Sequence, residues 1–260
     1  MSKQTTPRVL IVDIETWPIL ARVWGTRDQN VALNQIKTDW SILSWSAKWR
    51  GEKKIFYYDT GKQRDLRDDK KILKPLWDLL NQADIVVGQN SDRFDVPRIF
   101  SRFLFHKIKN RRLPEFIKQD TYKMAKKFHL TSYKLEYMAK YFGLKHHKMV
   151  TRKFVGQELW NGCEDRNPKA WAEMRKYNPQ DILATEELFE VLLPHDKKVN
   201  YSVFDPNNER CSCGSFALIK YGIKPRNGGL YQKYICQNCG KPHYGKDNQL
   251  SKIKKASLLK

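Results

Sequence analysis

Short apolar runs alternate along most of the chain with segments whose apolar residues recur at helical spacing. The continuous run at residues 8–14 is typical of a central strand, and the apolar and aromatic segments 41–49 and 53–59 predict a hairpin. Residues 83–90 predict another short, buried strand. Because strands come early and helices alternate with them later, the pattern predicts an α/β domain over residues 1–195.

Helical periodicity appears in five segments, which are residues 69–82, 92–109, 132–142, 168–176 and 179–193. Ser132 is the expected N-cap of the third segment and Gly143 its expected end. Asn178 is the expected N-cap of the last segment and Pro179 its first residue, because a residue before proline avoids the α conformation. Tyr177 is therefore expected to precede that helix.

The chain changes character after His195. Residues 196–210 are polar and contain a Pro-Asn-Asn turn signal, which predicts a linker. Residues 211–244 hold four closely spaced cysteines, and residues 245–260 form a basic tail that we expect to be loosely ordered. The predicted order is a large α/β domain, a linker, a small cysteine module and a tail.

Charge narrows the range of partners. The chain has 49 lysines and arginines against 28 acidic residues, a formal net charge of +21. Such a chain is expected to bind polyanions, with nucleic acid as the leading class and an anionic membrane surface as the rival. Basic runs at residues 106–112, 123–127 and 145–153 either form a groove for a nucleic-acid strand or are solvated faces.

Apolar stretches are too short for a membrane span, which needs roughly 18 residues. The N-terminus also lacks the apolar run of a signal peptide. We therefore expect a soluble, cytoplasmic protein without a membrane partner.

Two acids, Asp13 and Glu15, stand at the end of the first predicted strand. Residues two apart on a strand share a face, so both carboxylates are expected to point one way and Ile14 into the opposite layer. Carboxylates held together repel, and a divalent cation between them removes that cost. Oxygen-only ligands suit Mg²⁺ or Mn²⁺. Two acids at this spacing, without further acidic motifs, would more often form a helix N-cap or a surface ion pair.

Further acids follow in an ordered pattern. Asp95 lies in an apolar frame within residues 88–99, and Asp181 follows Tyr177 by four residues. The series D-I-E, N-x-x-x-F-D-x-P and Y-x-x-x-D resembles the three exonuclease motifs of the DEDDy 3′–5′ exonucleases. These are RNase H-like enzymes related to the proofreading domains of family B DNA polymerases. The resemblance covers about residues 8–194 and is closest in character to stand-alone bacterial and phage members.

The resemblance implies an RNase H-like mixed sheet flanked by helices, in a bacterial or phage-infected cell. It implies that two Mg²⁺ or Mn²⁺ ions are held by four carboxylates, those of Asp13, Glu15, Asp95 and Asp181. Asp13 would bridge the ions, and Tyr177 would position or polarise the attacking water.

Several residues near these motifs allow two interpretations. Asn90 and Phe94 could both contact the terminal nucleotide of a substrate. The alternative is that Asn90 only closes the strand-to-helix turn and that Phe94 only packs. Asp120 is a rival carboxylate that is more often structural than a ligand. Cys163 has no recognisable nucleophile context, and no partner is predicted by the spacing of His106, His129, His146 and His147.

Four cysteines form two knuckles, C-x-C-G with Cys211 and Cys213, and C-x-x-C-G with Cys236 and Cys239. A reducing compartment disfavours disulfides, so the clustering predicts one tetrahedral, structural Zn²⁺. The arrangement resembles a zinc ribbon whose first knuckle is one residue short, and His243 could stand in as a weak ligand. So small a module has almost no apolar core, so metal would supply much of its folding free energy.

Residues 217–235, between the two knuckles, mix lysine, arginine and tyrosine. Aromatic rings among cations suit stacking on bases and pairing with phosphates, so the segment is expected to bind nucleic acid. The alternative is a hairpin whose tyrosines only pack.

The resemblance, together with the strongly basic charge, implies a metal-dependent 3′–5′ exonuclease. It would remove nucleoside 5′-monophosphates from DNA, with a preference for single strands or frayed ends. RNA remains an alternative substrate, because no feature of the sequence reads a 2′-hydroxyl. A non-catalytic nucleic-acid-binding protein that recruits a polymerase or another replication partner is the alternative from a different class.

Overall fold

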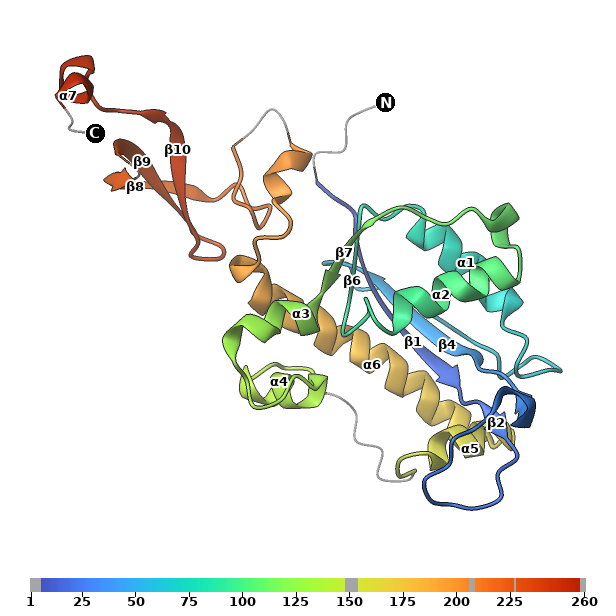
Figure 1. Ribbon diagram of the computed structural model, residues 1–260. Helices are drawn as coiled ribbons and strands as arrows, with labels where there is room; N and C mark the ends of the chain where they lie inside the picture. The colour runs from blue at the N-terminus through green and yellow to red at the C-terminus, as the bar shows by residue number, and fades with distance from the viewer. Residues whose placement is uncertain (1–5, 148–153, 206–208, 227, 258–260) are drawn as a thin grey trace. The chain divides into compact units, whose positions relative to one another are not determined.

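The computed structural model describes four stretches of the chain, residues 6–147, 154–205, 209–226 and 228–257. The predicted Pro-Asn-Asn turn and residues 148–153 of one basic run lie outside them. The chain divides into a larger unit, Arg8–Val191, and a smaller one formed mainly by Leu192–Lys260 (Figure 1).

The larger unit combines seven strands and six α-helices among its described residues. The strands are β1 (Val9–Trp17), β2 (Leu20–Ala21), β3 (Ile36–Thr38), β4 (Ser41–Trp49), β5 (Ile55–Asp59), β6 (Ile85–Gly88) and β7 (Ile117–Asp120). The helices are α1 (Lys70–Leu80), α2 (Asp95–Phe105), α3 (Thr121–Ala125), α4 (Leu135–Tyr141), α5 (Glu158–Glu164) and α6 (Pro168–Leu192). Short 3₁₀ turns occur at Leu33–Gln35, Ile108–Arg111 and Lys126–Phe128.

Five strands form one mixed sheet in the order β5-β4-β1-β6-β7. Strand β4 pairs antiparallel with both β1 and β5, and β6 pairs parallel with both β1 and β7. The predicted central strand and the predicted hairpin are both confirmed. Strand β7 and the small β2–β3 pair have no counterpart among the predicted elements, because they are short and lack a clear apolar run.

Helices cover the two faces of this sheet (Figure 1). On one face, Leu10, Val12 and Ile14 of β1 share a buried cluster with side chains of α1 and α2. On the other face, Trp17 of β1 packs in a second cluster with α5 and α6, including Trp171. The alternation along β1 therefore sends Ile14 and the neighbouring acids to opposite layers, as the strand period predicts. The α/β class with a mixed, helix-flanked sheet is confirmed.

Helix α6 differs from its prediction. It runs unbroken through Pro179, so the expectation that a helix ends at residue 176 and a new one begins at Pro179 is wrong. Proline in a helix interior costs about 3 kcal/mol through its missing N–H and its ring. The buried Asn178 side chain offsets this cost, since it accepts a hydrogen bond from the Ser46 hydroxyl (2.8 Å) and donates one to Asp13. Tyr177 is consequently a helical residue.

The other helix boundaries shift by smaller amounts. Helix α4 has Lys134 as its N-cap, and Ser132 instead accepts a hydrogen bond from the Lys134 N–H at 3.3 Å. The prediction of Ser132 as the cap is therefore wrong. Gly143 follows the end of α4 with a φ of +63°, as expected for a glycine that terminates a helix. Helix α2 begins at Asp95 rather than in the preceding turn.

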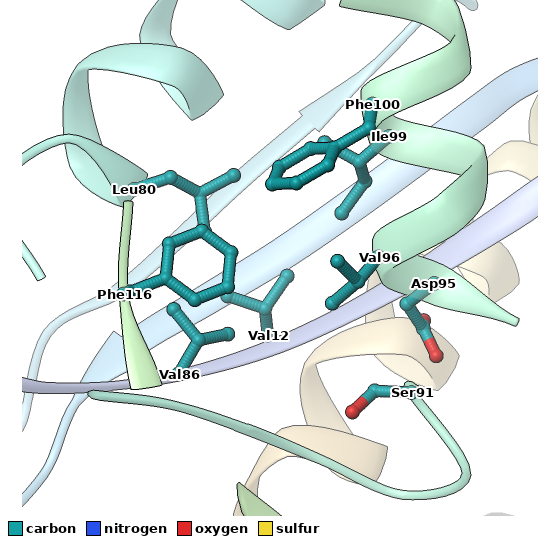
Figure 2. Close-up of a pocket in the computed structure, with 9 residues that line it drawn as sticks. All are labelled: Val12, Leu80, Val86, Ser91, Asp95, Val96, Ile99, Phe100 and Phe116. Atoms are coloured by element: carbon teal, nitrogen blue, oxygen red, sulfur yellow. The ribbon is translucent and has the colours of Figure 1, made fainter. Parts of the chain in front are cut away.

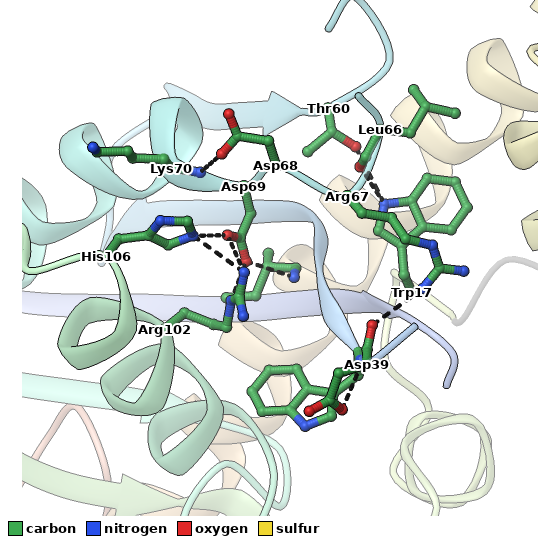
Figure 3. A network of polar contacts seen from close by, with 12 residues as sticks. Trp17, Asp39, Thr60, Leu66, Arg67, Asp68, Asp69, Lys70, Arg102 and His106 are labelled. Atoms are coloured by element: carbon green, nitrogen blue, oxygen red, sulfur yellow. Dashed lines mark hydrogen bonds and ion pairs between the residues drawn. The ribbon is translucent and has the colours of Figure 1, made fainter. Parts of the chain in front are cut away.

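A buried ion-pair network joins α1, α2 and β4 (Figure 3). The Asp69 carboxylate is fully buried and accepts two hydrogen bonds from the Arg102 guanidinium, at 2.7 and 2.8 Å. It also lies 2.6 Å from His106 Nε2 and accepts from the backbone N–H of Ile42 at 2.9 Å. One side chain thus fixes two helices against the sheet. Sequence spacing gave no hint of this partner for His106.

Replacing Asp69 by asparagine is expected to lower the free energy of unfolding of the larger unit by about 3 kcal/mol, because it leaves the Arg102 guanidinium, whose side chain is only 12% exposed, without a counter-charge. Urea denaturation followed by tryptophan fluorescence measures the change. The control is Asp68→Asn, because Asp68 is exposed and accepts a hydrogen bond from the Lys70 N–H. That variant is expected to stay within about 0.5 kcal/mol of the wild type. Equal losses in the two variants would contradict the assignment.

The smaller unit contains a three-stranded antiparallel sheet, ordered β10-β9-β8, and a short helix. Its elements are β8 (Leu218–Arg226), β9 (Gly229–Cys236), β10 (Pro242–Asn248) and α7 (Lys252–Ala256), with 3₁₀ turns at Leu193–His195 and Tyr201–Phe204. Strand β10 and helix α7 thus occupy much of the segment for which we predicted a loosely ordered tail.

The predicted linker, residues 196–210, carries buried side chains. Tyr201 is buried, and its N–H donates to the carbonyl of Ser212 at 3.1 Å. Asp205 and Arg210 are also buried and form an ion pair of 2.8 Å. The segment therefore packs onto the cysteine module. The polar composition of residues 196–210 did not predict this packing, because the buried side chains are an aromatic ring and an ion pair rather than an apolar run.

No helix in the described stretches is both long and apolar enough to span a bilayer.

Candidate active site and metal centres

Three of the four predicted ligands converge at one end of the sheet. Carboxylate oxygens of Asp13 and Glu15, from β1, and of Asp181, from α6, all lie within 4.8 Å of one another. The register of the β1–β4 pairing shifts directly after Glu15, between Glu15 and Thr16. Bulges of this kind re-aim side chains at strand ends. Hard oxygen ligands at this spacing are close enough to hold Mg²⁺ or Mn²⁺.

Asp13 is oriented by Asn178, which we had expected only as a helix N-cap. The Asn178 amide donates to Asp13 Oδ2 at 2.5 Å, and its own oxygen accepts from Ser46 of β4. Asn178 lies on α6 between Tyr177 and Asp181, so the same helix supplies a carboxylate and positions another. The only sequence signal was its place inside the Y-x-x-x-D motif.

Asp95 stands apart from this trio but lines the same cavity. It is the first residue of α2, only 3% exposed, and its Oδ1 accepts from the backbone N–H of Ile14 at 3.0 Å. Figure 2 shows its carboxylate beside Ser91, at the edge of an apolar group that includes Val96 and Ile99. Burial raises the pKa of Asp95 to about 7, although the Ile14 N–H opposes the increase.

The turn from β6 to α2 brings Asp95 against β1. At Gly88 a Cβ would lie 2.6 Å from the Cβ of Ser91 and 3.0 Å from the carbonyl of Val12, so only glycine fits this approach. Asn90 adopts a φ of +59°, and its N–H donates to Asp120 Oδ1 at 2.9 Å. Asp120 also accepts from the N–H groups of Asp92 and Tyr122. It therefore holds the turn, which is the structural role we expected.

The carboxylates border a cavity of about 740 Å³. This volume lies within the roughly 300–1,000 Å³ of small-ligand sites. The predicted residues Asn90 and Phe94 line it, and so do several residues that we did not select, namely Gln89, Tyr122, Tyr133, Lys134, Leu135 and Glu136. Tyr122 and Tyr133 form an edge-to-face pair with centroids 5.6 Å apart. Their signal in the sequence was weak, since Tyr122 follows the unpredicted strand β7.

Phe94 and Tyr177 both have packing partners. The Arg98 guanidinium lies 3.8 Å from the centre of the Phe94 ring, and Phe94 also packs on the buried cluster beneath α2. Tyr177 is 9% exposed and packs against Trp160, with centroids 6.1 Å apart. It lies one helical turn before Asp181, on the same side of α6. Among the described residues, the side chains that line the acidic cavity do not include Tyr177.

The cysteine group is equally compact. One sulfur from each of Cys211, Cys213, Cys236 and Cys239 lies within 4.8 Å of the others. Two Sγ–Sγ distances are 3.5 Å (Cys211 to Cys239) and 3.8 Å (Cys213 to Cys236). Thiolates at about 2.3 Å from a tetrahedral zinc ion are about 3.8 Å apart, so the cluster has the right size for one ion. His243 Nε2 lies 3.0 Å from Cys211 Sγ.

Thiol acidity in this group is uneven. Burial by itself raises the pKa of the Cys236 thiol. Hydrogen bonds with the backbone N–H groups of Cys239 and Asn238, and with the thiols of Cys211 and Cys239, together lower this pKa to about 7. Burial raises the pKa of Cys239 to about 11 and also raises that of Cys211. A metal ion would have to displace the protons of the latter two thiols. The fifth cysteine, Cys163, is buried in the larger unit, and burial raises its pKa to about 12, as suits an inert thiol.

Binding of Mn²⁺ to the zinc-loaded protein is expected to weaken about tenfold for each pH unit below pH 7, because Asp95, with its pKa near 7, must lose a proton before it can serve a cation. In the metal-free protein, the contribution of Asp95 to the stability of the fold changes with pH in the opposite direction to Mn²⁺ affinity. A carboxylate with a raised pKa stabilises the fold below about pH 4, and this stabilisation is lost as the pH rises towards 7.

Isothermal titration in buffers of different ionisation enthalpy measures the protons released on Mn²⁺ binding. Release of close to one proton per chain at pH 6 and almost none at pH 8 is expected. Equal affinity at the two pH values would contradict the role of Asp95.

Comparison with known proteins identifies the family of the larger unit. The RNase H superfamily matches residues 39–193. Among solved structures, the family B DNA polymerase from the archaeon Pyrobaculum calidifontis is similar in fold, with a TM-score of 0.52 and 20% identity. The alignment covers 72% of this chain and 25% of the polymerase.

A local similarity to a second protein is also present. Aspartate/glutamate leucyltransferase of Aeromonas hydrophila is 35% identical over 83 residues, which are 31% of this chain and 33% of that protein. The chain thus matches only a third of that relative's length.

Proposed function

The chain belongs to the RNase H superfamily, and we propose that it is a metal-dependent 3′–5′ exonuclease that hydrolyses terminal phosphodiesters of DNA. Membership of this superfamily supports nuclease activity in general. The observation that carries the finer proposal is the convergence of Asp13, Glu15 and Asp181 beside a cavity that Asp95 also lines. These acids come from three motifs in the order of the DEDDy enzymes.

The proposed roles follow from the donor set. Asp13, Glu15, Asp181 and Asp95 offer only carboxylate oxygens, which fit two Mg²⁺ or Mn²⁺ ions. Bound there, the cations would activate water and stabilise the charge that develops on the phosphate. Asn178 would hold the Asp13 carboxylate in one orientation for this purpose. Asp120, tied to three backbone N–H groups, would keep the turn before Asp95 in place.

Substrate preference is proposed from the shape and lining of the cavity. A single terminal nucleotide fits in about 740 Å³, whereas a base-paired end would first have to fray. Phe94, Tyr122 and Tyr133 offer rings on which a base could stack, and Asn90 offers an amide for hydrogen bonding. We therefore propose that single-stranded or frayed 3′ ends are preferred and that nucleoside 5′-monophosphates are released.

The two-unit organisation is proposed to separate chemistry from substrate holding. Residues 1–195 would carry the nuclease site, as the sequence predicts. The four cysteines of residues 211–244 would bind one structural Zn²⁺, for which their spacing is suitable. The DNA partner is supported by the net charge of +21.

Tyr177→Phe is expected to lower the rate of hydrolysis about a hundredfold, the lower end of the range for loss of one positioned acid–base group. The fold is expected to persist, because the ring still packs against Trp160. Single-turnover assays with saturating enzyme measure the chemical step. A wild-type rate for Tyr177→Phe would leave Tyr177 with a packing role alone.

A time course on labelled oligonucleotides tests the main proposal. Single- and double-stranded DNA carrying a 5′ or a 3′ label is incubated with Mg²⁺, Mn²⁺ or no added metal. We expect a ladder that shortens from the 3′ end, faster on single strands, only when metal is present. Shortening from the 5′ end, internal cuts, or products with a 3′-phosphate would overturn the assignment.

A further inference from the structure

The sheet of the smaller unit has two chemically different faces. Strand β9 is central, with β8 and β10 paired on either side, as the orange and red strands of Figure 1 show. The register places Lys224 opposite Tyr231 and Tyr244 opposite Lys233. Because alternate residues of a strand share a face, these four side chains lie on one side of the sheet.

A bulge in β8 keeps further residues on that side. The register shifts between Lys220 and Ile223, at Gly222, whose φ is +80°. The extra residue returns the next part of β8 to the same face, so Tyr221 before the bulge and Arg226 after it share one side. We call this side the tyrosine face and define it by six residues, Tyr221, Lys224, Arg226, Tyr231, Lys233 and Tyr244.

Contacts between side chains support this placement. Lys233 Nζ lies 5.0 Å from the centre of the Tyr221 ring, and the Arg226 guanidinium lies 4.8 Å from the centre of the Tyr244 ring. The Tyr231 ring folds over Gly229, where a Cβ would come within 2.6 Å of it. Tyr221 is 56% exposed. The face thus presents rings and cations side by side in the solvent.

A cavity of about 650 Å³ lies beside this sheet. Its lining mixes the acids Asp205, Glu209 and Asp247 with the cations Arg210 and Lys246, and it also includes Tyr244 of the tyrosine face. Among the described residues, the tyrosine face contains no acidic side chain. Residues 211–260 as a whole carry ten basic residues and one acidic residue. Three of these ten cations, Lys224, Arg226 and Lys233, belong to the tyrosine face and lie beside its rings.

We propose that the tyrosine face binds single-stranded DNA, with unpaired bases stacked on tyrosine rings and phosphates held by Lys224, Arg226 and Lys233. Stacking and backbone pairing together are how proteins hold single strands without reading sequence. In duplex DNA the faces of the bases are stacked on one another, so duplex DNA can bind the cations of the tyrosine face but cannot stack on its rings. The inference extends the proposed function by giving its substrate a second contact outside the acidic cavity.

Fluorescence anisotropy with a labelled dT30 strand tests the proposal on the full, zinc-loaded chain, without added Mg²⁺ or Mn²⁺ so that the strand is not consumed. Tyr221→Ala is expected to weaken binding about tenfold, the loss of one stacked base, whereas Tyr221→Phe stays within about twofold. Lys224→Ala is expected to lower the slope of log Kd against log salt concentration by about 0.7, the value for loss of one phosphate contact with a single strand.

Lys220→Ala is the matched control, because Lys220 is an exposed cation of the same strand on the opposite face. It is expected to change dT30 binding less than twofold. Equal losses in Lys220→Ala and Lys224→Ala would overturn the proposal in favour of diffuse charge. Duplex DNA bound as tightly as dT30, or binding of matched RNA but not of DNA, would overturn it as well. Bound zinc and circular dichroism are measured for every variant, so that an unfolded module is not mistaken for a lost contact.

Hydrolysis separates this proposal from the nuclease assignment. Tyr221 does not line the acidic cavity, so Tyr221→Ala is expected to cleave a saturating concentration of a trinucleotide at the wild-type rate. If the wild-type chain cleaves nothing but still binds dT30 through the tyrosine face, the nuclease proposal fails while this one stands. If cleavage occurs and Tyr221→Ala binds dT30 normally, the reverse holds.

Discussion

Replacement of both Asp13 and Glu15 by alanine is expected to abolish hydrolysis while leaving DNA binding largely intact. Removing two of the three converging carboxylates leaves no site for a cation pair, and loss of that stabilisation by about 5 kcal/mol corresponds to a rate decrease of roughly 10⁴-fold. A 3′-labelled oligonucleotide with Mn²⁺ measures the rate. Anisotropy with the same strand measures binding.

The control for this experiment is Glu136→Gln. Glu136 lines the same cavity but is not one of the three clustered acids, and its carboxylate instead lies 3.3 Å from Lys140. Its variant is expected to keep activity within about threefold, since a surface ion pair contributes little. Activity in the double alanine variant equal to the wild type would sink the nuclease assignment. A loss of activity in Glu136→Gln equal to that of the double alanine variant would indicate that negative charge in the cavity, rather than metal ligation by Asp13 and Glu15, supports hydrolysis.

Cys236→Ala is expected to remove zinc and unfold the smaller unit while the larger unit stays folded. Structural zinc sites supply on the order of 10 kcal/mol of apparent folding free energy, and the exposed sheet β8–β10 has little apolar surface to replace it. Limited proteolysis followed by mass spectrometry is expected to find cleavage within residues 211–257 and a protected fragment containing Arg8–Val191. Chelation of the wild-type protein is expected to give the same pattern.

Two variants serve as controls for the zinc prediction. Cys163→Ala removes a thiol buried among the side chains of α5 and α6, so zinc content is expected to stay at one ion per chain. His243→Ala is expected to retain zinc as well, because four thiols complete a tetrahedral site without it. Loss of zinc in His243→Ala would make the histidine a ligand in place of a cysteine. A fully protected smaller unit in Cys236→Ala would contradict the metal site.

Much of the larger unit was predictable because its local signals agree with one another. The apolar run of β1, the hairpin of β4 and β5, and the periodicity of α1 each match the structure. The i, i+2 spacing of Asp13 and Glu15 predicted a shared face, and Ile14 indeed packs in the opposite layer. The order of the acidic motifs also placed Asp181 near them, although it is far along the chain. No contact between these segments could be read from composition.

Helix α6 shows where local rules fail. Pro179 predicts a helix start, and the preference of Asn178 for extended backbone adds to that signal. In the fold, Asn178 is buried and bonded to Ser46 and Asp13, and Asp181 and Ile182 are buried beside it. Several such contacts together outweigh about 3 kcal/mol for one proline. None of them exists until the sheet has formed.

Residue types and short-range spacing were enough to predict the strongly basic charge, the central strand with two acids near its end, the ordered acidic motifs and the pairing of cysteines. Those features are local, because they depend on residue type and on spacing of a few positions. Three further features became visible in the fold alone: Asn178 fixes Asp13, burial of Asp95 raises its pKa, and three tyrosines share one face with three cations. Each of these depends on distances between segments far apart in the chain, which are set by packing and strand register.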